Sequence, residues 1–118
     1  MINLELLDFI IREQGCVVCF ALGLGIVPCA KHHLLTTQRH GTGKRRGERA
    51  VVGLCDYHHQ GQSQVGSEAA AHLYPVRGPS YADQPREFRG LWPDEKLEAL
   101  QAARIDEWRS RQVGITWP

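Results

Sequence analysis

The sequence predicts a small α+β fold in which two short strands lie between helical segments at the two ends of the chain. The 118 residues, 42% of them hydrophobic and 23% charged, suffice for one folded domain with one modest core. Apolar residues recur at helical spacing near the N-terminus and again in the last third of the chain. Two stretches rich in apolar and β-branched residues lie between these regions, and such stretches favour strands.

The first half of the chain is expected to form a helix followed by two strands. A helix is predicted over residues 4–14, because an asparagine that can cap it precedes this segment and a glycine follows it. Residues 26–34 favour a strand, and residues 50–54 favour a second one. Between them, residues 36–49 contain three glycines and no hydrophobic period, which indicates a long exposed loop. A short helix is expected to begin at Cys55.

The second half is expected to consist of connections and helices. Residues 61–79 hold scattered glycine, serine, proline and glutamine, which indicates an extended connection with a turn of helix near residues 68–73. Pro85 is suited to open a short predicted helix over residues 85–88, and Pro93 is suited to the first turn of a longer one over residues 93–111. We expect this helical third to pack against the first half of the chain.

Composition and charge limit the class of protein. The longest apolar runs are far shorter than the ~20 residues that a membrane span needs, and the N-terminal segment lacks the basic start of a secretory signal. A cytoplasmic location is therefore expected, where cysteines bind metal or do redox chemistry more often than they form disulfides. The net charge is only +1, so any affinity for nucleic acid must come from a local basic patch.

Four residues have the spacing of a structural zinc site. Cys16 and Cys19 are separated by two residues, as are Cys55 and His58, so each pair can present two ligands from a tight turn. Together they predict a tetrahedral Cys₃His site for Zn²⁺ that stabilises the fold. Cys29 is an alternative fourth ligand, although a thiol without a paired ligand nearby is more often simply buried. The competing interpretation is that the cysteines are buried hydrophobic residues and that His58 lies at the surface.

Three further histidines lie close to these pairs. His32 and His33 end the first predicted strand and therefore point to opposite faces, so they cannot perform the same role. One of them can bind a metal while its neighbour approaches a substrate. His59 follows His58 on the predicted helix and can face away from the zinc toward the strands. The alternative is that all three are ordinary surface histidines.

A basic run lies in the predicted loop between the two strands. Lys44, Arg45, Arg46 and Arg49, with Arg39 nearby, can bind phosphates of double- or single-stranded nucleic acid. This would be a positioning role and not recognition of bases. In isolation such a run is as often only a solvated charged segment.

The order of these motifs resembles that of the zinc-containing HNH endonucleases. More specifically, the sequence is similar to the Ref (recombination enhancement function) nucleases of phages and prophages. The residues that carry this similarity fall roughly within residues 14–90 and are Lys31-His-His-Leu34, Gly41-x-Gly-Lys-Arg-Arg46, Gly53-Leu-Cys-Asp-Tyr-His-His-Gln-Gly61, Gly78-Pro-Ser80 and Phe88.

The resemblance implies a fold and a chemistry. It implies one nuclease domain over residues 1–118, with a ββα-metal (His-Me finger) core and structural zinc knuckle at about 14–62 and a helical extension at about 80–112. It further implies that the chain is an endonuclease that cuts DNA in recombination or DNA processing. Within the site, His32 and His59 would bind a catalytic divalent cation such as Mg²⁺, and His33 would be the general base. A RecA-type recombinase filament would be a partner.

One departure from the HNH pattern concerns the residue that gives the family its middle letter. The usual asparagine lies about five residues before the cysteine at position 55, where this chain has Ala50, and no asparagine occurs between residues 34 and 60. Its orienting role would fall to His40 or to a backbone carbonyl.

Two other classes of function compete with the nuclease. The first is a zinc-stabilised DNA- or protein-binding module without catalytic activity, which would have no use for His33. The second is a thiol redox protein that uses Cys16 and Cys19, but no βαβ pattern surrounds that motif.

Overall fold

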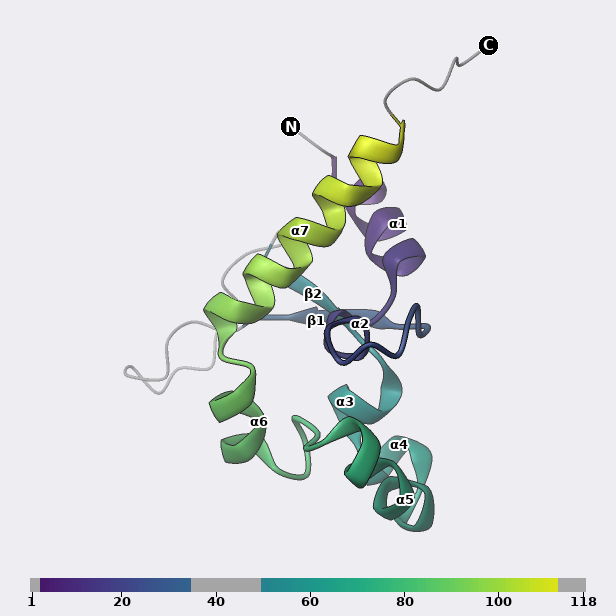
Figure 1. Cartoon of the computed structure of the whole chain (residues 1–118), viewed down its shortest axis with the longest axis vertical. Helices are drawn as coiled ribbons and strands as arrows, with labels where there is room; N and C mark the ends of the chain where they lie inside the picture. The colour runs from purple at the N-terminus through teal and green to yellow at the C-terminus, as the bar shows by residue number, and fades with distance from the viewer. Residues whose placement is uncertain (1–2, 35–49, 113–118) are drawn as a thin grey trace.

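The computed structural model describes residues 3–34 and 50–112 and shows a small, mostly helical α+β fold with one two-stranded sheet (Figure 1). The predicted α+β class is thus confirmed. The elements over these residues are α1 (Leu4–Gln14), α2 (Val17–Ala21), β1 (Ala30–His33), β2 (Val51–Leu54), α3 (Asp56–Gln60), α4 (Gln62–Val65), α5 (Ser67–Arg77), α6 (Pro85–Leu91) and α7 (Asp94–Gln112). Within these two ranges, no helix has both the length and the apolar character that crossing a membrane requires. The predicted basic loop, with Arg39, His40, Lys44, Arg45, Arg46 and Arg49, lies outside the described residues.

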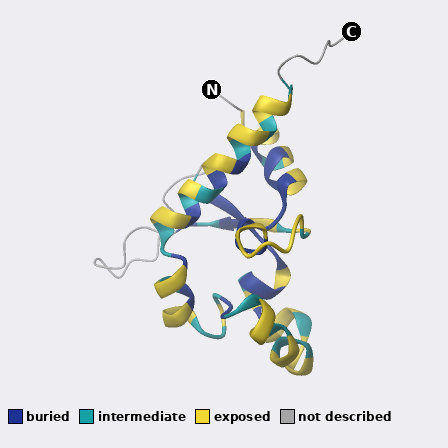
Figure 2. Ribbon diagram, viewed as in Figure 1, coloured by how far each residue is buried: buried dark blue, intermediate teal, exposed yellow. Residues whose placement is uncertain are grey.

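The two strands pair antiparallel and fix the positions of the histidines. Ala30 pairs with Leu54 at one end of the ladder, and His33 pairs with Val51 at the other. Beyond His33, the amide of Leu34 donates to the carbonyl of Ala50 at 2.8 Å, which continues the backbone pairing past the last paired residue. All four residues of β2 are buried, because α1 and α7 both pack on this strand (Figure 2).

The core lies between the sheet and the helices. Its largest fully buried side chains include Ile10, Ile11, Leu54 and Phe88. Gly53 allows the end of α1 to approach the strand closely, since a Cβ atom at this position would lie only 2.7 Å from the Cys29 sulfur and 3.0 Å from the Gly15 carbonyl oxygen. A side chain there would push α1 away from the sheet.

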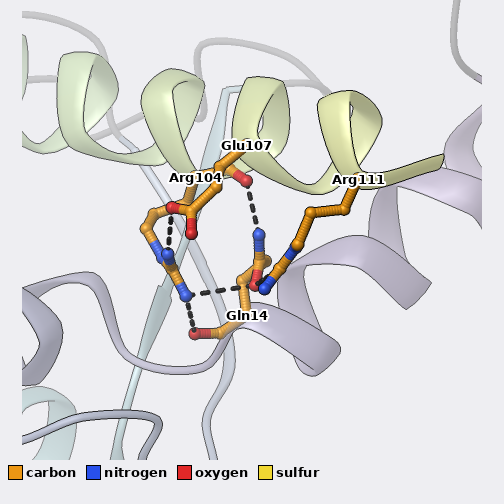
Figure 3. A network of polar contacts seen from close by, with 4 residues as sticks. All are labelled: Gln14, Arg104, Glu107 and Arg111. Carbon is orange, nitrogen blue, oxygen red and sulfur yellow. Dashed lines mark hydrogen bonds and ion pairs between the residues drawn. The ribbon is translucent and has the colours of Figure 1, made fainter. Parts of the chain in front are cut away.

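A buried polar network ties the end of α1 to α7 (Figure 3). The side-chain amide of Gln14 donates to the carbonyl of Arg104 at 2.6 Å, and its carbonyl oxygen accepts from Arg104 at 3.0 Å and from Arg111 at 2.9 Å. Arg104 also pairs with Glu107 and lies over the ring of Phe20 on α2, 3.6 Å from its centroid. Because Gln14 lies two residues before Cys16, this network fixes where α2 begins.

The structure differs from the sequence-based expectation in the first strand and in two helices. The predicted strand 26–34 is shortened to Ala30–His33, because the carbonyl of Val27 accepts from the Cys16 amide at 2.9 Å and Pro28 has no N–H to donate to a ladder. The connection expected over 61–79 is largely helical, since α4 and α5 occupy most of it. The helix predicted over residues 4–14 has the bounds of α1.

Candidate functional site

Two similar turns present the two ligand pairs, Cys16 with Cys19 and Cys55 with His58. Cys16 is the N-cap of α2, where its sulfur accepts a hydrogen bond from the Cys19 amide at 3.4 Å. Cys55 is the N-cap of α3 in the same way, with its sulfur 3.4 Å from the His58 amide. In each turn the cap and the residue three positions later therefore point in the same direction, as the sequence spacing predicts.

The four side chains of these turns meet at one buried point. The ligand atoms of Cys16, Cys19, Cys55 and His58 all lie within 4.8 Å of one another. The His58 Nδ1 atom lies 3.6, 3.4 and 3.3 Å from the sulfurs of Cys16, Cys19 and Cys55, and the last two sulfurs are 3.7 Å apart. Tetrahedral Zn²⁺, with Zn–S of about 2.3 Å and Zn–N of about 2.0 Å, would separate two sulfurs by about 3.8 Å and a sulfur and a nitrogen by about 3.5 Å. The cluster can therefore hold a metal ion such as zinc.

The charges in this cluster favour a cation at its centre. Burial lowers the pKa of the His58 imidazole, but hydrogen bonds to the Cys16 and Cys55 sulfurs outweigh it and raise the pKa to about 9. Hydrogen bonds from the Cys16 and Cys19 thiols hold the pKa of Cys55 far below its ordinary value, whereas the Cys19 thiol has a raised pKa because the same kind of contact stabilises its proton. Without a metal, shared protons form hydrogen bonds between the sulfurs and the imidazole. Metal binding would release those protons.

Arg77, at the end of α5, supports the cluster in two ways. Its backbone carbonyl lies 2.9 Å from Nε2 of His58 and accepts the proton of that nitrogen, which keeps Nδ1 facing the sulfurs. Its guanidinium Nη1 atom lies 3.9 Å from the Cys55 sulfur, where it can offset the negative charge of thiolates. Arg77 carries no motif signal, so sequence reasoning did not identify it.

Cys29, the alternative fourth ligand, lies outside this cluster. Its thiol donates to the backbone carbonyl of Ile11 at 3.3 Å, and burial raises its pKa to about 11, so it remains protonated. The structure therefore gives this cysteine a packing contact with α1.

A second site lies on the other side of α3, where two histidines meet. Nδ1 of His32 lies 3.0 Å from Nε2 of His59, and the ring centroids are 4.6 Å apart. His32 comes from β1, opposite Val52, and His59 follows the cluster residue His58 directly on α3. One short helix thus directs consecutive histidines to two different sites, as the sequence predicts.

Both histidines of this pair favour the neutral state. Burial, with the charges of His59, His33 and Arg89, lowers the pKa of His32 to about 4. Burial also lowers the pKa of His59, against the opposing effect of Asp56. Neutral imidazoles have lone pairs available for a metal ion.

His33 lies beside this pair but does not join it. It is half-buried at the end of β1, opposite Val51, and alternation along the strand places it on the face opposite to His32. Of the three histidines expected at the second site, the structure brings two into contact and leaves the third next to them.

Two residues near the pair carried no sequence signal. The ring of Tyr81 packs against His32 with centroids 4.9 Å apart, and the Tyr81 amide donates to the carbonyl of His58 at 2.8 Å. The guanidinium of Arg89, on α6, donates to the Tyr81 hydroxyl oxygen at 2.8 Å. The nearby Gly78-Pro-Ser80 segment and Phe88 stood out in the sequence, and they indicated similarity and not a role.

Comparison with known proteins gives one match. A family model described as "Recombination enhancement, RecA-dependent nuclease" matches residues 5–104, a range that contains both the Cys₃His cluster and the histidine pair. No curated protein and no solved structure matches the chain.

Proposed function

The chain belongs to the family of recombination-enhancement, RecA-dependent nucleases, and from this membership we propose that it is a metal-dependent DNA endonuclease of the HNH (ββα-metal) type. The observation that carries the proposal is the 3.0 Å contact between His32 and His59, held beside a buried Cys₃His cluster. In this proposal residues 1–118 form one nuclease domain, with the metal core at about 14–62 and a helical extension at about 80–112.

The Cys₃His cluster would hold structural zinc. Its ligand atoms are buried, and four protein ligands leave no open coordination position for a substrate. Residues 16–19 open α2 and residues 55–58 open α3, so an ion bound there would join these two helices. Its contribution would be to folding and not to the reaction.

The histidine pair would hold the second, catalytic cation. Neighbouring ligands at about 2.1 Å from an octahedral ion lie about 3.0 Å apart, which is the separation of the His32 and His59 nitrogens. Two nitrogens are few ligands for Mg²⁺, so oxygen atoms from substrate phosphate and water would complete the shell. A divalent cation bound there would stabilise charge on the phosphate and on the leaving 3′ oxygen.

His33 would be the general base. The imidazole at the end of β1 would take a proton from the water that attacks phosphorus, while its neighbour His32 holds the metal. The orienting role of the missing HNH asparagine would fall to His40 or to a backbone carbonyl, and the backbone bond from Leu34 to Ala50 restrains this strand end.

The remaining parts of the proposal concern the substrate and its context. Lys44, Arg45, Arg46 and Arg49 would bind phosphates along the DNA, single- or double-stranded. A RecA-type filament would deliver the substrate, in recombination or DNA processing of phage or prophage origin.

The dependence of cleavage on added metal tests this proposal. We expect the purified, zinc-loaded chain to nick supercoiled plasmid or to cut single-stranded DNA only when Mg²⁺ or Mn²⁺ is added, because zinc in the closed cluster cannot bind substrate. The measurement is the rate of product formation on gels with and without each cation. Equal rates in both reactions would contradict the second metal site, and DNA binding without any cleavage would favour the non-catalytic binding module.

A further inference from the structure

An arginine and a tyrosine extend the histidine pair toward α6. The Tyr81 ring contacts the ring of His32, and its hydroxyl oxygen accepts a hydrogen bond from Nη2 of Arg89 at 2.8 Å. The Arg89 guanidinium carbon also lies 5.3 Å from the centroid of the Tyr81 ring. Three side chains thus form a continuous row from β1 through the turn at Tyr81 to α6.

A backbone hydrogen bond and a ring contact hold Tyr81, the middle residue of this row, in place. The Tyr81 amide donates to the His58 carbonyl at 2.8 Å, and the Tyr81 ring packs edge-on against the fully buried Phe88, with centroids 5.7 Å apart. Tyr81 is therefore fixed both to the helix that carries His59 and to the helix that carries Arg89. A guanidinium placed in this way is oriented before any substrate arrives.

Arg89 retains most of its capacity to bind an anion. Within residues 3–34 and 50–112, no carboxylate forms an ion pair with it, whereas Arg12 and Arg104 each pair with one. A guanidinium has five N–H donors, and the contact with Tyr81 uses one of them. Arg89 is half-buried, so its charge acts in a partly desolvated setting next to His32.

We propose that Arg89 binds a phosphate group of the nucleic acid at the histidine pair and that Tyr81 is the positioning residue that orients it. This inference rests on the proposed nuclease function, because it assigns the substrate phosphate to the same site. The ligand chemistry is a phosphodiester oxygen, which a planar guanidinium can hold with two parallel hydrogen bonds. The Tyr81 hydroxyl acts on the phosphate only through Arg89, because its oxygen accepts from Nη2 and so fixes the direction of the guanidinium.

Substitutions at these positions can be compared with a matched control on the same helix. Arg86 lies one turn earlier on α6 and is exposed, so Arg86→Ala removes the same charge from the same helix without touching the row. We expect Arg89→Ala to lower kcat/KM for DNA cleavage by about 10²-fold, the effect of losing one oriented donor at a reacting oxyanion. Arg89→Lys should lower kcat/KM by less, since lysine keeps the positive charge but lacks the planar guanidinium that forms two parallel hydrogen bonds. Tyr81→Phe should lower kcat/KM about tenfold, and Arg86→Ala should remain within about twofold of wild type.

DNA affinity as a function of salt separates this inference from the proposed function. Without added metal, Arg89→Ala should flatten the dependence of log K on log salt by roughly one phosphate contact, a change of about 0.9 in slope for duplex DNA. Zinc content and circular dichroism of every variant verify that it is folded. If wild type cleaves and Arg89→Ala matches Arg86→Ala in rate and in salt slope, the inference is wrong while the nuclease proposal stands. If wild type does not cleave, the nuclease proposal fails, and the salt slope alone decides whether Arg89 binds phosphate.

Discussion

Cys55→Ser is expected to leave the chain without bound zinc and largely unfolded at 25 °C. Structural zinc contributes roughly 10–16 kcal/mol of apparent binding free energy in small zinc modules. The whole stability of a domain of ordinary size is about 5–15 kcal/mol. Loss of one of four buried ligands therefore removes a contribution as large as the net stability. Metal content by mass spectrometry and the circular dichroism melting curve are the measurements.

Cys29→Ser is the matched control for this variant. Cys29 is half-buried where Cys55 is fully buried, and its sulfur contacts the carbonyl of Ile11 and not the cluster. A serine hydroxyl can keep that hydrogen bond. We expect this variant to retain one zinc per chain and to lose little stability, about 1 kcal/mol. A Cys55→Ser chain that melts like wild type, or a Cys29→Ser chain that loses its zinc, would show that the ligand set is wrong.

His33→Ala is expected to lower the rate of DNA cleavage by about 10²- to 10⁴-fold, the range that a general base contributes. Zinc content and melting temperature should stay close to wild type, because His33 is only half-buried and lies outside the cluster. The rate of plasmid nicking at saturating Mg²⁺ is the measurement.

The control for His33 lies two residues earlier on the same strand. Lys31 is exposed and lies on the same face of β1 as His33, where it pairs with Asp8 at 3.5 Å. Lys31→Ala should cleave DNA at close to the wild-type rate, since exposed ion pairs contribute little. Wild-type cleavage by His33→Ala would remove this residue from the mechanism, even if the metal site is correct.

Much of the candidate site was predictable because its residues are close together in sequence. The pairs Cys16 with Cys19 and Cys55 with His58 each fit one helical turn, so spacing favoured the four residues that meet and left only Cys29 as an alternative fourth ligand. The similarity to Ref nucleases, predicted from the motifs, is confirmed by the family match. Helix α1 was also predictable, since its cap, its period and its final glycine all agree.

Other parts of the site depend on contacts between distant segments, and no local pattern reveals these. Arg77 reaches the cluster through its backbone carbonyl, which every residue type possesses. Tyr81 contacts His32 from an irregular turn, and Arg89 contacts Tyr81 from α6. Both residues lie more than forty positions after His32 in the chain. Their roles depend on how α6 docks on the core, and the sequence pattern does not specify that docking.

The errors in secondary structure have a similar cause. Residues 26–29 are apolar enough for a strand, but the amide of Cys16 bonds to Val27 and removes it from the sheet. The scattered glycine, serine, proline and glutamine of residues 61–79 predict a connection with one turn of helix near residues 68–73, yet α5 spans eleven residues. Its alanines are strong helix formers, and their propensity outweighs the proline near its end. The predicted phosphate-binding role of the basic loop stays a prediction, because residues 35–49 lie outside the described ranges.

In the proposed mechanism, the contact between His32 and His59 is a catalytic metal site separate from the Cys₃His cluster. The rate at which zinc-loaded His32→Ala nicks plasmid DNA in Mg²⁺, measured beside wild type at equal zinc content, tests it most directly. His32 lies on β1 and contributes no atom to the cluster, so this variant should keep one zinc per chain. We predict a loss of cleavage of about 10²-fold or more. Cleavage at the wild-type rate by the zinc-loaded variant would contradict the account.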